Sequence, residues 1–333
     1  MIPDNAPGEG AAAAVSRALR GRRVLVTGGA GFIGSHLVDA LDGLGASVRV
    51  LDDLSSGKLT NLESCRERVE FLEGDIRDAA TCRRACEGVD VVFHQAALGS
   101  VPRSLQDPAT SLAVNVGGSA NIFAAARETG VGRTVYASSS SVYGDSEVLP
   151  KREGEEGEPL SPYALSKVMG EQLARVFARC YGMQIVGLRY FNVFGPRQDP
   201  VGPYAAVIPR FFKAFLSKTA PVVYGDGEQS RDFTYVADVV ACNLLAAACP
   251  EGACGRAYNV AGGRATTVNA LARAVRDICG GGPEPNHLPP REGDVLHSLA
   301  DLKSARERLG YAPEFTLERG LSAARAYYAS LSE

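Results

Sequence analysis

The sequence contains no long apolar run, and nothing in it approaches the ~18 apolar residues of a bilayer-spanning helix. It also lacks a marked excess of charge of one sign, because 35 basic and 38 acidic residues leave a net charge of −3. Charge therefore gives no reason to expect a nucleic acid or an anionic membrane as a partner. The apolar stretch at residues 11–15 has no basic residues before it and is too short for a signal-peptide core.

Cysteines are present but not in a metal-binding arrangement. No pair has zinc-type CxxC spacing together with a partner pair or a nearby histidine, so no metal is expected. Cys82 and Cys86 would share one face of a helix, which indicates packing. The eight cysteines are interpreted as free thiols in a reducing cytoplasm.

Short β-branched, apolar segments alternate with longer helical segments along the first 190 residues. The expected strands are residues 23–27, 47–51, 69–73, 89–94, 133–138 and 184–189, and the expected helices are 32–44, 79–87, 108–129 and 162–181. This alternation predicts an α/β fold with a Rossmann-type, doubly wound parallel sheet. Residues 1–10 are expected to form a disordered tail and residues 11–20 a short helix.

After about residue 190 the sequence becomes richer in proline, glycine and polar loops. Helices are expected at residues 205–216, 236–249, 268–279 and 317–330, with short strands at 222–224 and 257–260. We therefore expect a smaller, loop-rich C-terminal lobe over the edge of the sheet, where ligands of such sheets bind. The acidic residues 153–158 are expected to form a solvated loop.

A glycine-rich turn separates the first expected strand from the first long helix. Gly28, Gly31 and Gly34 have the spacing GxxGxxG, which permits a tight turn and lets a pyrophosphate approach the helix N-terminus. A plain strand–helix turn is the alternative interpretation. Asp52 ends the second expected strand, where a carboxylate accepts hydrogen bonds from ribose hydroxyls and repels a 2′-phosphate, which favours NAD over NADP. Asp53 is the less favoured partner.

Tyr163 and Lys167 stand four residues apart, in a segment that begins with Ser161 as a good N-cap and Pro162 as a good first helical residue. The two side chains would share one helix face. A free tyrosine titrates near ~10, and lowering its pKa to about 7 requires roughly 4 kcal/mol of phenolate stabilisation. A lysine ammonium and a positive nicotinamide ring could supply it. A tyrosine four residues before a lysine is common on helices and does not by itself indicate a catalytic base. Only the glycine-rich turn upstream, which predicts a bound dinucleotide, favours that interpretation. His94 is interpreted as a core histidine.

The chain resembles the extended short-chain dehydrogenase/reductase superfamily, and within it the bacterial UDP-N-acetylglucosamine 4-epimerases. The GxxGxxG turn carries the resemblance, together with HQAALGSVPRS at residues 94–104, LRYFNVFG at 188–195 and REGDVLHSLAD at 291–301. It implies a tightly bound NAD, a UDP-sugar substrate and a cytoplasmic enzyme of nucleotide-sugar metabolism and polysaccharide biosynthesis. It also implies a homodimer formed through the helices at 108–129 and 162–181, although the apolar residues Leu173, Val176 and Phe177 fit core packing equally well.

The resemblance further implies a division of labour along the chain. Residues 1–20 would be an N-terminal extension, residues 21–190 plus 233–262 the NAD-binding domain, and residues 191–232 plus 263–333 the nucleotide-sugar-binding lobe. The catalytic triad falls on Ser139, Tyr163 and Lys167, and the sequence pattern alone does not separate Ser139 from Ser140. Tyr163, as a phenolate, would take the proton of the 4-hydroxyl while NAD oxidises carbon 4. The 4-keto sugar would then turn and be reduced on its other face.

The resemblance assigns two sets of binding residues. The cofactor-binding set is Gly28, Gly31, Phe32, Ile33, Gly34, Asp52, Asp53, Asp75, Ile76, Gln95, Ala96, Ala97, Asn115, Ser138, Tyr163, Lys167, Tyr190 and Val193. The substrate-binding set is Gly99, Ser100, Ser139, Ser140, Tyr163, Asn192, Gln198, Ala206, Val207, Val222, Tyr224, Arg231, Arg291, Asp294 and Ser298. The two arginines suit phosphate oxygens, and for Arg231 an ion pair with Asp232 is the alternative.

Three positions bear on which reaction is catalysed. Ser298 stands where epimerases restricted to glucose and galactose carry a bulky tyrosine, so it would leave room for a 2-acetamido group. Ser140 and Ser141 stand where related dehydratases carry Asp-Glu and decarboxylases carry a glutamate. We therefore expect a 4-epimerase of UDP-GlcNAc and UDP-GalNAc, with UDP-glucose and UDP-galactose as additional candidate substrates. UDP-N-acetylglucosaminuronate or UDP-glucuronate 4-epimerisation is the alternative. A dehydratase or decarboxylase is less favoured, and the Tyr/Lys pair argues against a non-catalytic NAD-binding module.

Overall fold

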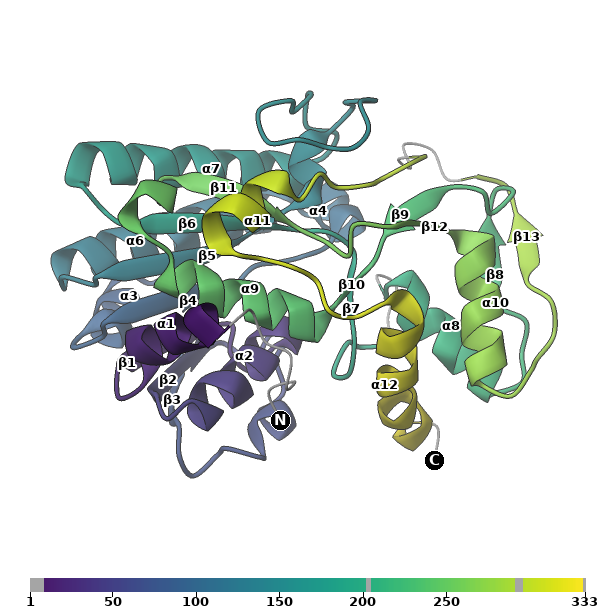
Figure 1. The fold of residues 1–333 in the computed structure, drawn as a ribbon, viewed down its shortest axis with the longest axis horizontal. Coiled ribbons are helices and arrows are strands. Elements are labelled where there is room, and N and C mark those ends of the chain that lie inside the picture. The colour runs from purple at the N-terminus through teal and green to yellow at the C-terminus, as the bar shows by residue number, and fades with distance from the viewer. Residues whose placement is uncertain (1–8, 202–204, 291–295, 332–333) are drawn as a thin grey trace.

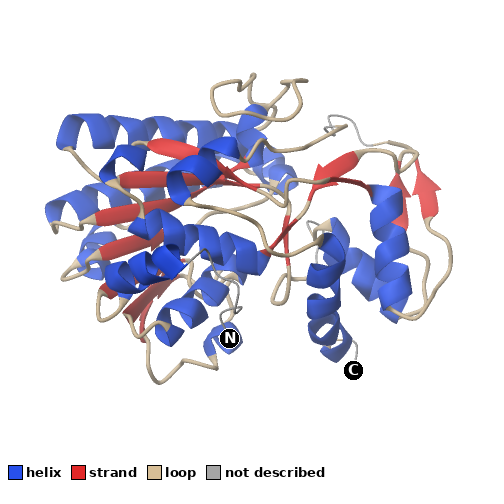
Figure 2. Ribbon diagram, in the orientation of Figure 1, coloured by secondary structure: helices blue, strands red, loops and turns tan. Residues whose placement is uncertain are grey.

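The computed structural model describes residues 9–201, 205–290 and 296–331. Its centre is a seven-stranded sheet of order β11-β6-β5-β4-β1-β2-β3, and all its strand pairings are parallel. Its strands are β1 (Arg23–Thr27), β2 (Ser47–Asp52), β3 (Glu70–Glu73), β4 (Val91–His94), β5 (Arg133–Ser139), β6 (Ile185–Tyr190) and β11 (Arg256–Val260). This strand order is that of a dinucleotide-binding sheet, and it confirms the predicted Rossmann-type fold (Figures 1 and 2).

Helices cover both faces of the sheet. Alternate strand residues pack against helices of one face or the other, which is why the strands read as continuous apolar runs. One face carries α1 (Glu9–Leu19), α2 (Phe32–Gly43), α9 (Val236–Ala248) and α11 (Lys303–Leu309). The other carries α3 (Ala79–Cys86), α6 (Ser119–Glu128) and α7 (Pro162–Tyr181). Cys82 and Cys86 lie on the buried face of α3, as their spacing predicted.

A second lobe stands beside the carboxyl ends of the strands, on the right in Figure 1. It has its own apolar core, which helices α8 (Val207–Leu216), α10 (Val268–Ile278) and α12 (Leu317–Ser330) build. Small sheets flank it and pair β7 (Val193–Phe194) with β10 (Thr234–Tyr235), β9 (Ser230–Asp232) with β12 (Ala265–Thr267), and β8 (Val222–Tyr224) with β13 (Asn286–Leu288). The expected C-terminal lobe is therefore present.

The prediction of a single helix at residues 108–129 is wrong. The chain forms α5 (Pro108–Leu112), a wide π-helical turn η2 (Ala113–Gly118) and then α6, and it forms an unpredicted helix α4 (Val101–Gln106) before them. Within the π turn, Asn115 accepts a hydrogen bond from the Leu98 N–H at 2.8 Å and donates to Ser166 Oγ at 3.0 Å. π turns of this kind often mark functional sites. The remaining short helices are the 3₁₀ turns η1 (Leu59–Leu62), η3 (Ser140–Tyr143) and η4 (Glu251–Ala253).

Two smaller expectations are corrected. Helix α1 already begins at Glu9, inside the segment expected to be a disordered tail; residues 1–8 lie outside the described part of the chain. The acidic loop is not wholly solvated, because Glu153 Oε1 accepts the Asn259 N–H at 2.8 Å and Glu156 pairs with Arg189 at 2.5 Å. Both carboxylates thus hold the loop against the sheet domain.

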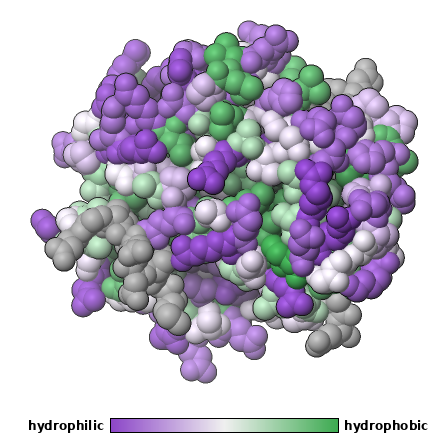
Figure 3. Space-filling model, turned by 45° about the vertical axis from the view of Figure 1, so that its right-hand side comes forward, coloured by the Kyte–Doolittle hydropathy of each residue, from purple (hydrophilic) through white to green (hydrophobic). Residues whose placement is uncertain are grey.

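None of the described helices combines the length and apolar character that crossing a bilayer requires. On the face shown in Figure 3, hydrophobic residues lie in small groups among hydrophilic ones. The described residues also contain no cluster of three or more histidine, cysteine, aspartate or glutamate side chains that could hold a metal ion.

Candidate active site

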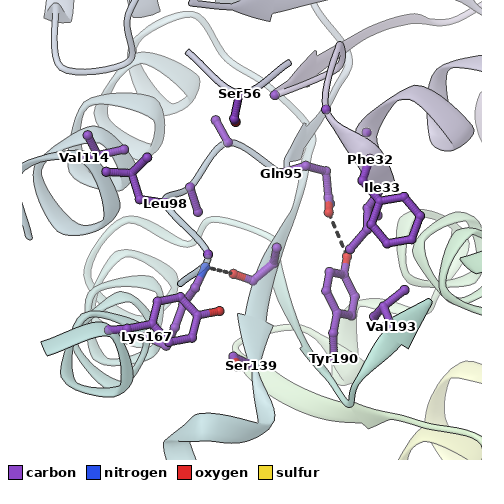
Figure 4. A pocket seen from close by; sticks show the side chains of 18 of the residues that line it. Phe32, Ile33, Ser56, Gln95, Leu98, Val114, Ser139, Lys167, Tyr190 and Val193 are labelled. Carbon is purple, nitrogen blue, oxygen red and sulfur yellow. Dashed lines mark hydrogen bonds between the residues drawn. The ribbon is translucent and has the colours of Figure 1, made fainter. Parts of the chain in front are cut away.

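A cavity of about 550 Å³ opens at the carboxyl ends of β1, β4, β5 and β6. It lies where the chain order reverses between β1 and β4, which is the ligand-binding crevice of such sheets. In Figure 4, Lys167 and Leu98 lie on one side of it, and Ile33, Tyr190 and Val193 lie on the other. The predicted cofactor residues that line it are Gly28, Gly31, Phe32, Ile33, Gly34, Asp52, Asp53, Ile76, Gln95, Ala96, Ala97, Ser138, Tyr163, Lys167, Tyr190 and Val193.

The glycine turn forms a cradle that side chains would fill. Gly28 has a φ of +66°, and a Cβ there would lie 2.8 Å from the backbone of Ala96. A Cβ at Gly34 would run into the carbonyl oxygen of Gly28. Helix α2 begins after Gly31 with no side-chain cap, so its first N–H groups face the cavity without a capping acceptor. These features fit the pyrophosphate of a dinucleotide.

Asp52 supports this turn as well as lining the cavity. Only 6% of its surface is exposed, and its two carboxylate oxygens accept the N–H groups of Ala30 and Leu54, each at 2.9 Å. Burial raises the pKa of Asp52, and the two backbone hydrogen bonds oppose that rise. Each oxygen keeps a lone pair for a ribose hydroxyl. Asp53 instead accepts hydrogen bonds from the N–H and hydroxyl of Ser55.

Asp75 and Asn115 stand back from the cavity in the described part of the chain. Asp75 forms an ion pair with Arg77 at 2.5 Å, and that hydrogen bond lowers the pKa of Asp75. Asn115 holds the peptide of Leu98, a residue that lines the cavity. Direct contacts of these two side chains with the cofactor stay a prediction.

Two predicted cofactor residues, Gln95 and Tyr190, form a hydrogen-bonded group with Asn243, which the sequence did not reveal. The Tyr190 hydroxyl donates to Gln95 Oε1 at 2.9 Å (Figure 4) and also receives a hydrogen bond from Asn243 at 2.9 Å. Burial raises the pKa of Tyr190, so this hydroxyl stays neutral. Asn243 lies on α9, whose sequence is apolar apart from Asp238 and Asn243 and reads mainly as core, so no local signal could have identified it.

The predicted triad meets in this cavity. Ser161 Oγ caps α7 by accepting the Ala164 N–H at 3.1 Å, and Tyr163 and Lys167 follow on one face of the helix. Ser139, at the end of β5, lies beside the Tyr163 side chain and acts to lower the pKa of its hydroxyl, which favours it over Ser140 as the third member. Lys167 Nζ donates to the Ala137 carbonyl at 2.8 Å and lies 5.8 Å from the centroid of the Tyr163 ring.

The electrostatics of the triad differ from the expectation in one respect. Burial raises the pKa of Tyr163, with the Ser139 hydrogen bond opposing, so the side chains of this protein alone do not lower it. Burial lowers the pKa of Lys167 to about 8, and Glu171 opposes that change. Ionising the phenol therefore requires a further positive charge beside it.

His94 is a core histidine, as predicted. Its ring nitrogens lie 2.7 Å from Thr27 Oγ1 and 2.9 Å from Ser119 Oγ. Burial and, to a smaller extent, the nearby Lys167 lower the pKa of His94 to about 3, so the ring is neutral at physiological pH.

A second cavity of about 210 Å³ adjoins the first. Asn192 and Ala206 line both cavities, which together can accept an elongated ligand. The predicted substrate residues around the second cavity are Asn192, Ala206, Val207, Val222, Tyr224 and Arg231. Arg210 and Gln229 also line it, and neither is among the residues predicted from the sequence.

The other predicted substrate residues fall into three groups. Gly99, Ser140 and Gln198 line the first cavity with Ser139 and Tyr163, and Gln198 Oε1 is buried with no partner among the described residues. Ser100 caps α4, and Ser298 is not among the described residues that line either cavity. Arg291 and Asp294 lie outside the described residues.

Asp232, the residue that follows Arg231, uses its carboxylate to hold backbone groups of other segments. The Asp232 carboxylate accepts the N–H groups of Gly263 at 3.0 Å and Ala300 at 3.1 Å. Burial raises the pKa of Asp232 to about 6, and these backbone hydrogen bonds oppose the rise. Asp232 therefore has a structural role: it connects β9 to the segment that follows β11 and to the segment that precedes α11.

Comparison with known proteins gives concordant matches. The model of a family described as "NAD dependent epimerase/dehydratase family" matches residues 24–261. A UDP-glucose 4-epimerase of Mycolicibacterium smegmatis is 40% identical over 315 residues, which cover 93% of this chain and 100% of that protein.

Two solved structures are similar over nearly their whole length. The Thermotoga maritima UDP-glucose 4-epimerase with UDP-glucose superposes with a TM-score of 0.89 at 40% identity, covering 93% of this chain and 100% of that one. The Methanobrevibacter ruminantium UDP-N-acetylglucosamine 4-epimerase, in complex with UDP-N-acetylmuramic acid, has a TM-score of 0.89 at 39% identity and covers 94% and 99%.

Proposed function

We propose that this chain, which belongs to the NAD dependent epimerase/dehydratase family, interconverts UDP-GlcNAc and UDP-GalNAc, and also UDP-glucose and UDP-galactose. The broader assignment, an NAD-dependent 4-epimerase of UDP-sugars, rests on relatives that share 40% of the sequence over almost the whole chain. We propose that residues 21–190 with 233–262 hold NAD and that residues 191–232 with 263–333 hold the nucleotide sugar.

One observation carries the proposal. Tyr163, Lys167 and Ser139 converge in a cavity that the glycine turn also lines, and a second cavity continues from it past Asn192. The first cavity offers a dinucleotide cradle and a base, and the second offers space for the nucleotide end of the substrate. A protein that only binds NAD and catalyses no reaction does not need a Tyr/Lys pair in this cavity.

The residues of the chain have distinct parts in the reaction. When bound, oxidised NAD supplies the electron acceptor for carbon 4 of the sugar and a positive ring beside the phenol. Tyr163 takes the proton of the 4-hydroxyl and later returns it, and Ser139 donates a hydrogen bond to the same oxygen. Lys167, protonated below its pKa of about 8, stabilises the Tyr163 phenolate across the helix face.

Two serines support epimerisation over elimination or decarboxylation. Ser140 and Ser141 line the cavity beside Ser139. An alcohol cannot act as a general acid or base of useful pKa at neutral pH, and both competing reactions need such a group at this place. Ser141 Oγ is buried without a hydrogen-bond partner among the described residues, so it is available to a substrate hydroxyl.

The proposed function is tested by direct assay. Purified protein without added NAD is incubated separately with UDP-GlcNAc, UDP-glucose, UDP-glucuronate and UDP-N-acetylglucosaminuronate, and the products are resolved by anion-exchange chromatography and proton NMR. We expect 4-inverted product from UDP-GlcNAc and nucleotide-bound protein as isolated. If only the two uronic acids were inverted, the substrate would be a UDP-uronic acid and the present substrate assignment would be wrong. If a product had lost water or carbon dioxide, the enzyme would be a dehydratase or a decarboxylase and the proposed reaction would be wrong.

We also propose a homodimer and a cytoplasmic location. Leu173 and Phe177 pack into the core, whereas Leu165, Met169 and Val176 on the same helix are 40%, 39% and 49% exposed. Leu105 on the adjacent α4 is 63% exposed, so a row of apolar side chains lies along α4 and α7 and suits a second copy of this chain. All eight cysteines are free thiols, which supports a reducing compartment.

Met169→Glu should convert this dimer to a monomer, because an ionised carboxylate would be buried in the apolar row. Light scattering coupled to size-exclusion chromatography measures the mass. Leu288→Glu is the matched control, since Leu288 is a 45%-exposed apolar residue on β13, far from α7 in the fold, and should leave the mass unchanged. An unchanged mass for the Met169 variant would move the interface elsewhere.

A further inference from the structure

Three side chains at four-residue intervals form a row on α7. Tyr163, Lys167 and Glu171 each contact one of the last three residues of β5. Ser139 lies beside the Tyr163 side chain, the Ala137 carbonyl accepts from Lys167 Nζ at 2.8 Å, and Ser138 Oγ donates to Glu171 Oε1 at 2.5 Å. The third pair repeats the pattern of the first two, although Glu171 is not part of the triad.

The Glu171 carboxylate is held in a buried, charge-assisted cluster. Its Oε1 accepts from Arg189 Nε at 2.9 Å and its Oε2 from Arg189 Nη2 at 2.7 Å, and the two side chains are only 7% and 5% exposed. Arg189 also pairs with Glu156 at 2.5 Å and donates to the Tyr143 hydroxyl at 3.0 Å. Two carboxylates thus surround one guanidinium, so the cluster keeps a net negative charge next to Lys167.

We infer that Glu171 is a positioning residue of this active site: it anchors the serine-bearing end of β5 and supplies the negative charge that keeps Lys167 protonated beside Tyr163. The inference rests on the proposed function for its meaning in catalysis. Its structural part, the coupling of Glu171 to Lys167, is separable from that function.

The charges around Lys167 show in which direction Glu171 changes the pKa of Lys167. Glu171 faces it from the next turn of α7 and favours the ammonium form. His94 on β4 is neutral, Tyr163 lies on the preceding turn, and Arg189 on β6 is occupied by its two carboxylates. Burial already lowers the pKa of Lys167 to about 8, so removing the Glu171 charge lowers that pKa further. Without the Glu171 charge, Lys167 then loses its proton at a lower pH than in the wild type, and the Tyr163 phenolate is no longer stabilised above that pH.

Glu171→Gln tests this coupling. The amide keeps the shape and one acceptor oxygen but loses the charge, and Glu156 remains to pair with Arg189. The alkaline limb of the kcat/KM–pH profile should move down by about one pH unit. The loss of activity is therefore about tenfold above that limb and small on its acid side. A merely structural role would lower the whole profile evenly without moving the limb.

Three further variants separate charge from geometry. Glu156→Gln removes the other carboxylate of the cluster, which does not face Lys167, and should leave the titration of Lys167 unchanged. Ser138→Ala breaks the 2.5 Å hydrogen bond to Glu171 and keeps the charge, so kcat should fall without a shift of the limb. Glu171→Asp keeps the charge on a shorter side chain and should retain the wild-type limb position; it also serves if the glutamine variant does not fold.

The second measurement does not depend on turnover. Carbon-13 NMR of the lysine ε-carbons titrates Lys167 directly, with its signal assigned by its absence in Lys167→Met. We expect a lower Lys167 pKa in Glu171→Gln than in the wild type and in Glu156→Gln. Equal Lys167 titrations in all three proteins would overturn the inference. If the wild type turns over no UDP-sugar, the proposed function fails, whereas the NMR titration still decides whether Glu171 controls Lys167.

Discussion

Replacing Tyr163 with phenylalanine should lower kcat for UDP-sugar epimerisation by about 10³-fold, the size of effect expected for a general base. The substitution removes one oxygen atom and leaves the ring in place between α7 and β5. It therefore takes away the group that Ser139 binds, without opening a void that would disturb the cavity. The kcat is measured with saturating UDP-GlcNAc, and the NAD content of the purified variant is measured alongside it.

NAD content should stay at the wild-type level, because the glycine turn and Asp52 are untouched. Tyr258→Phe is the matched control, since the Tyr258 hydroxyl donates to the Ala253 carbonyl at 2.6 Å near the amino end of β11, away from the cavity. This control should keep its kcat. A Tyr163 variant that retained more than about a tenth of the wild-type kcat would contradict the assignment of the base.

The parts of this fold that depend on local sequence were predictable. The glycine turn, the N-cap at Ser161 and the seven parallel strands follow from patterns within a few residues of one another. Helix 108–129 was not predictable in detail, because its π turn depends on Asn115 reaching back to the peptide of Leu98. The strand pattern gives no information on such a contact between separate elements.

The candidate site shows the same division. The residues in the GxxGxxG turn line the cavity as expected, whereas Asn243 and Arg210 come from distant helices and carry no signal of their own. The acidic run at residues 153–158 reads as solvated in sequence, but Glu156 turns inward to Arg189, 33 residues further along the chain. Burial also decides the direction of the Tyr163 pKa, and burial is a property of the assembled fold.

Ser298→Tyr should lower kcat/KM for UDP-GlcNAc by at least about 100-fold and leave kcat/KM for UDP-glucose within a few-fold of the wild type. The segment that bears Ser298 is fixed on β9: the Ser298 N–H donates to the Ser230 carbonyl at 3.1 Å, and the ring of His297 bonds Ser230 Oγ at 3.0 Å. Ser298 is itself only 9% exposed. The backbone there is held in place, so we expect a tyrosine ring at residue 298 to be directed into the space that the acetamido group would need.

The paired substrates make this experiment specific. A general loss of folding lowers both activities, whereas a steric gate lowers only that for the N-acetylated sugar, and circular dichroism checks the fold of the variant. Leu296→Tyr is the control, because Leu296 precedes the same pairing with Ser230 and is 70% exposed, so a larger ring can point to solvent. Unchanged turnover of UDP-GlcNAc by Ser298→Tyr would remove residue 298 from the sugar pocket. In that case Gly99 and Gln198, which do line the first cavity, would be left to select the substituent at carbon 2.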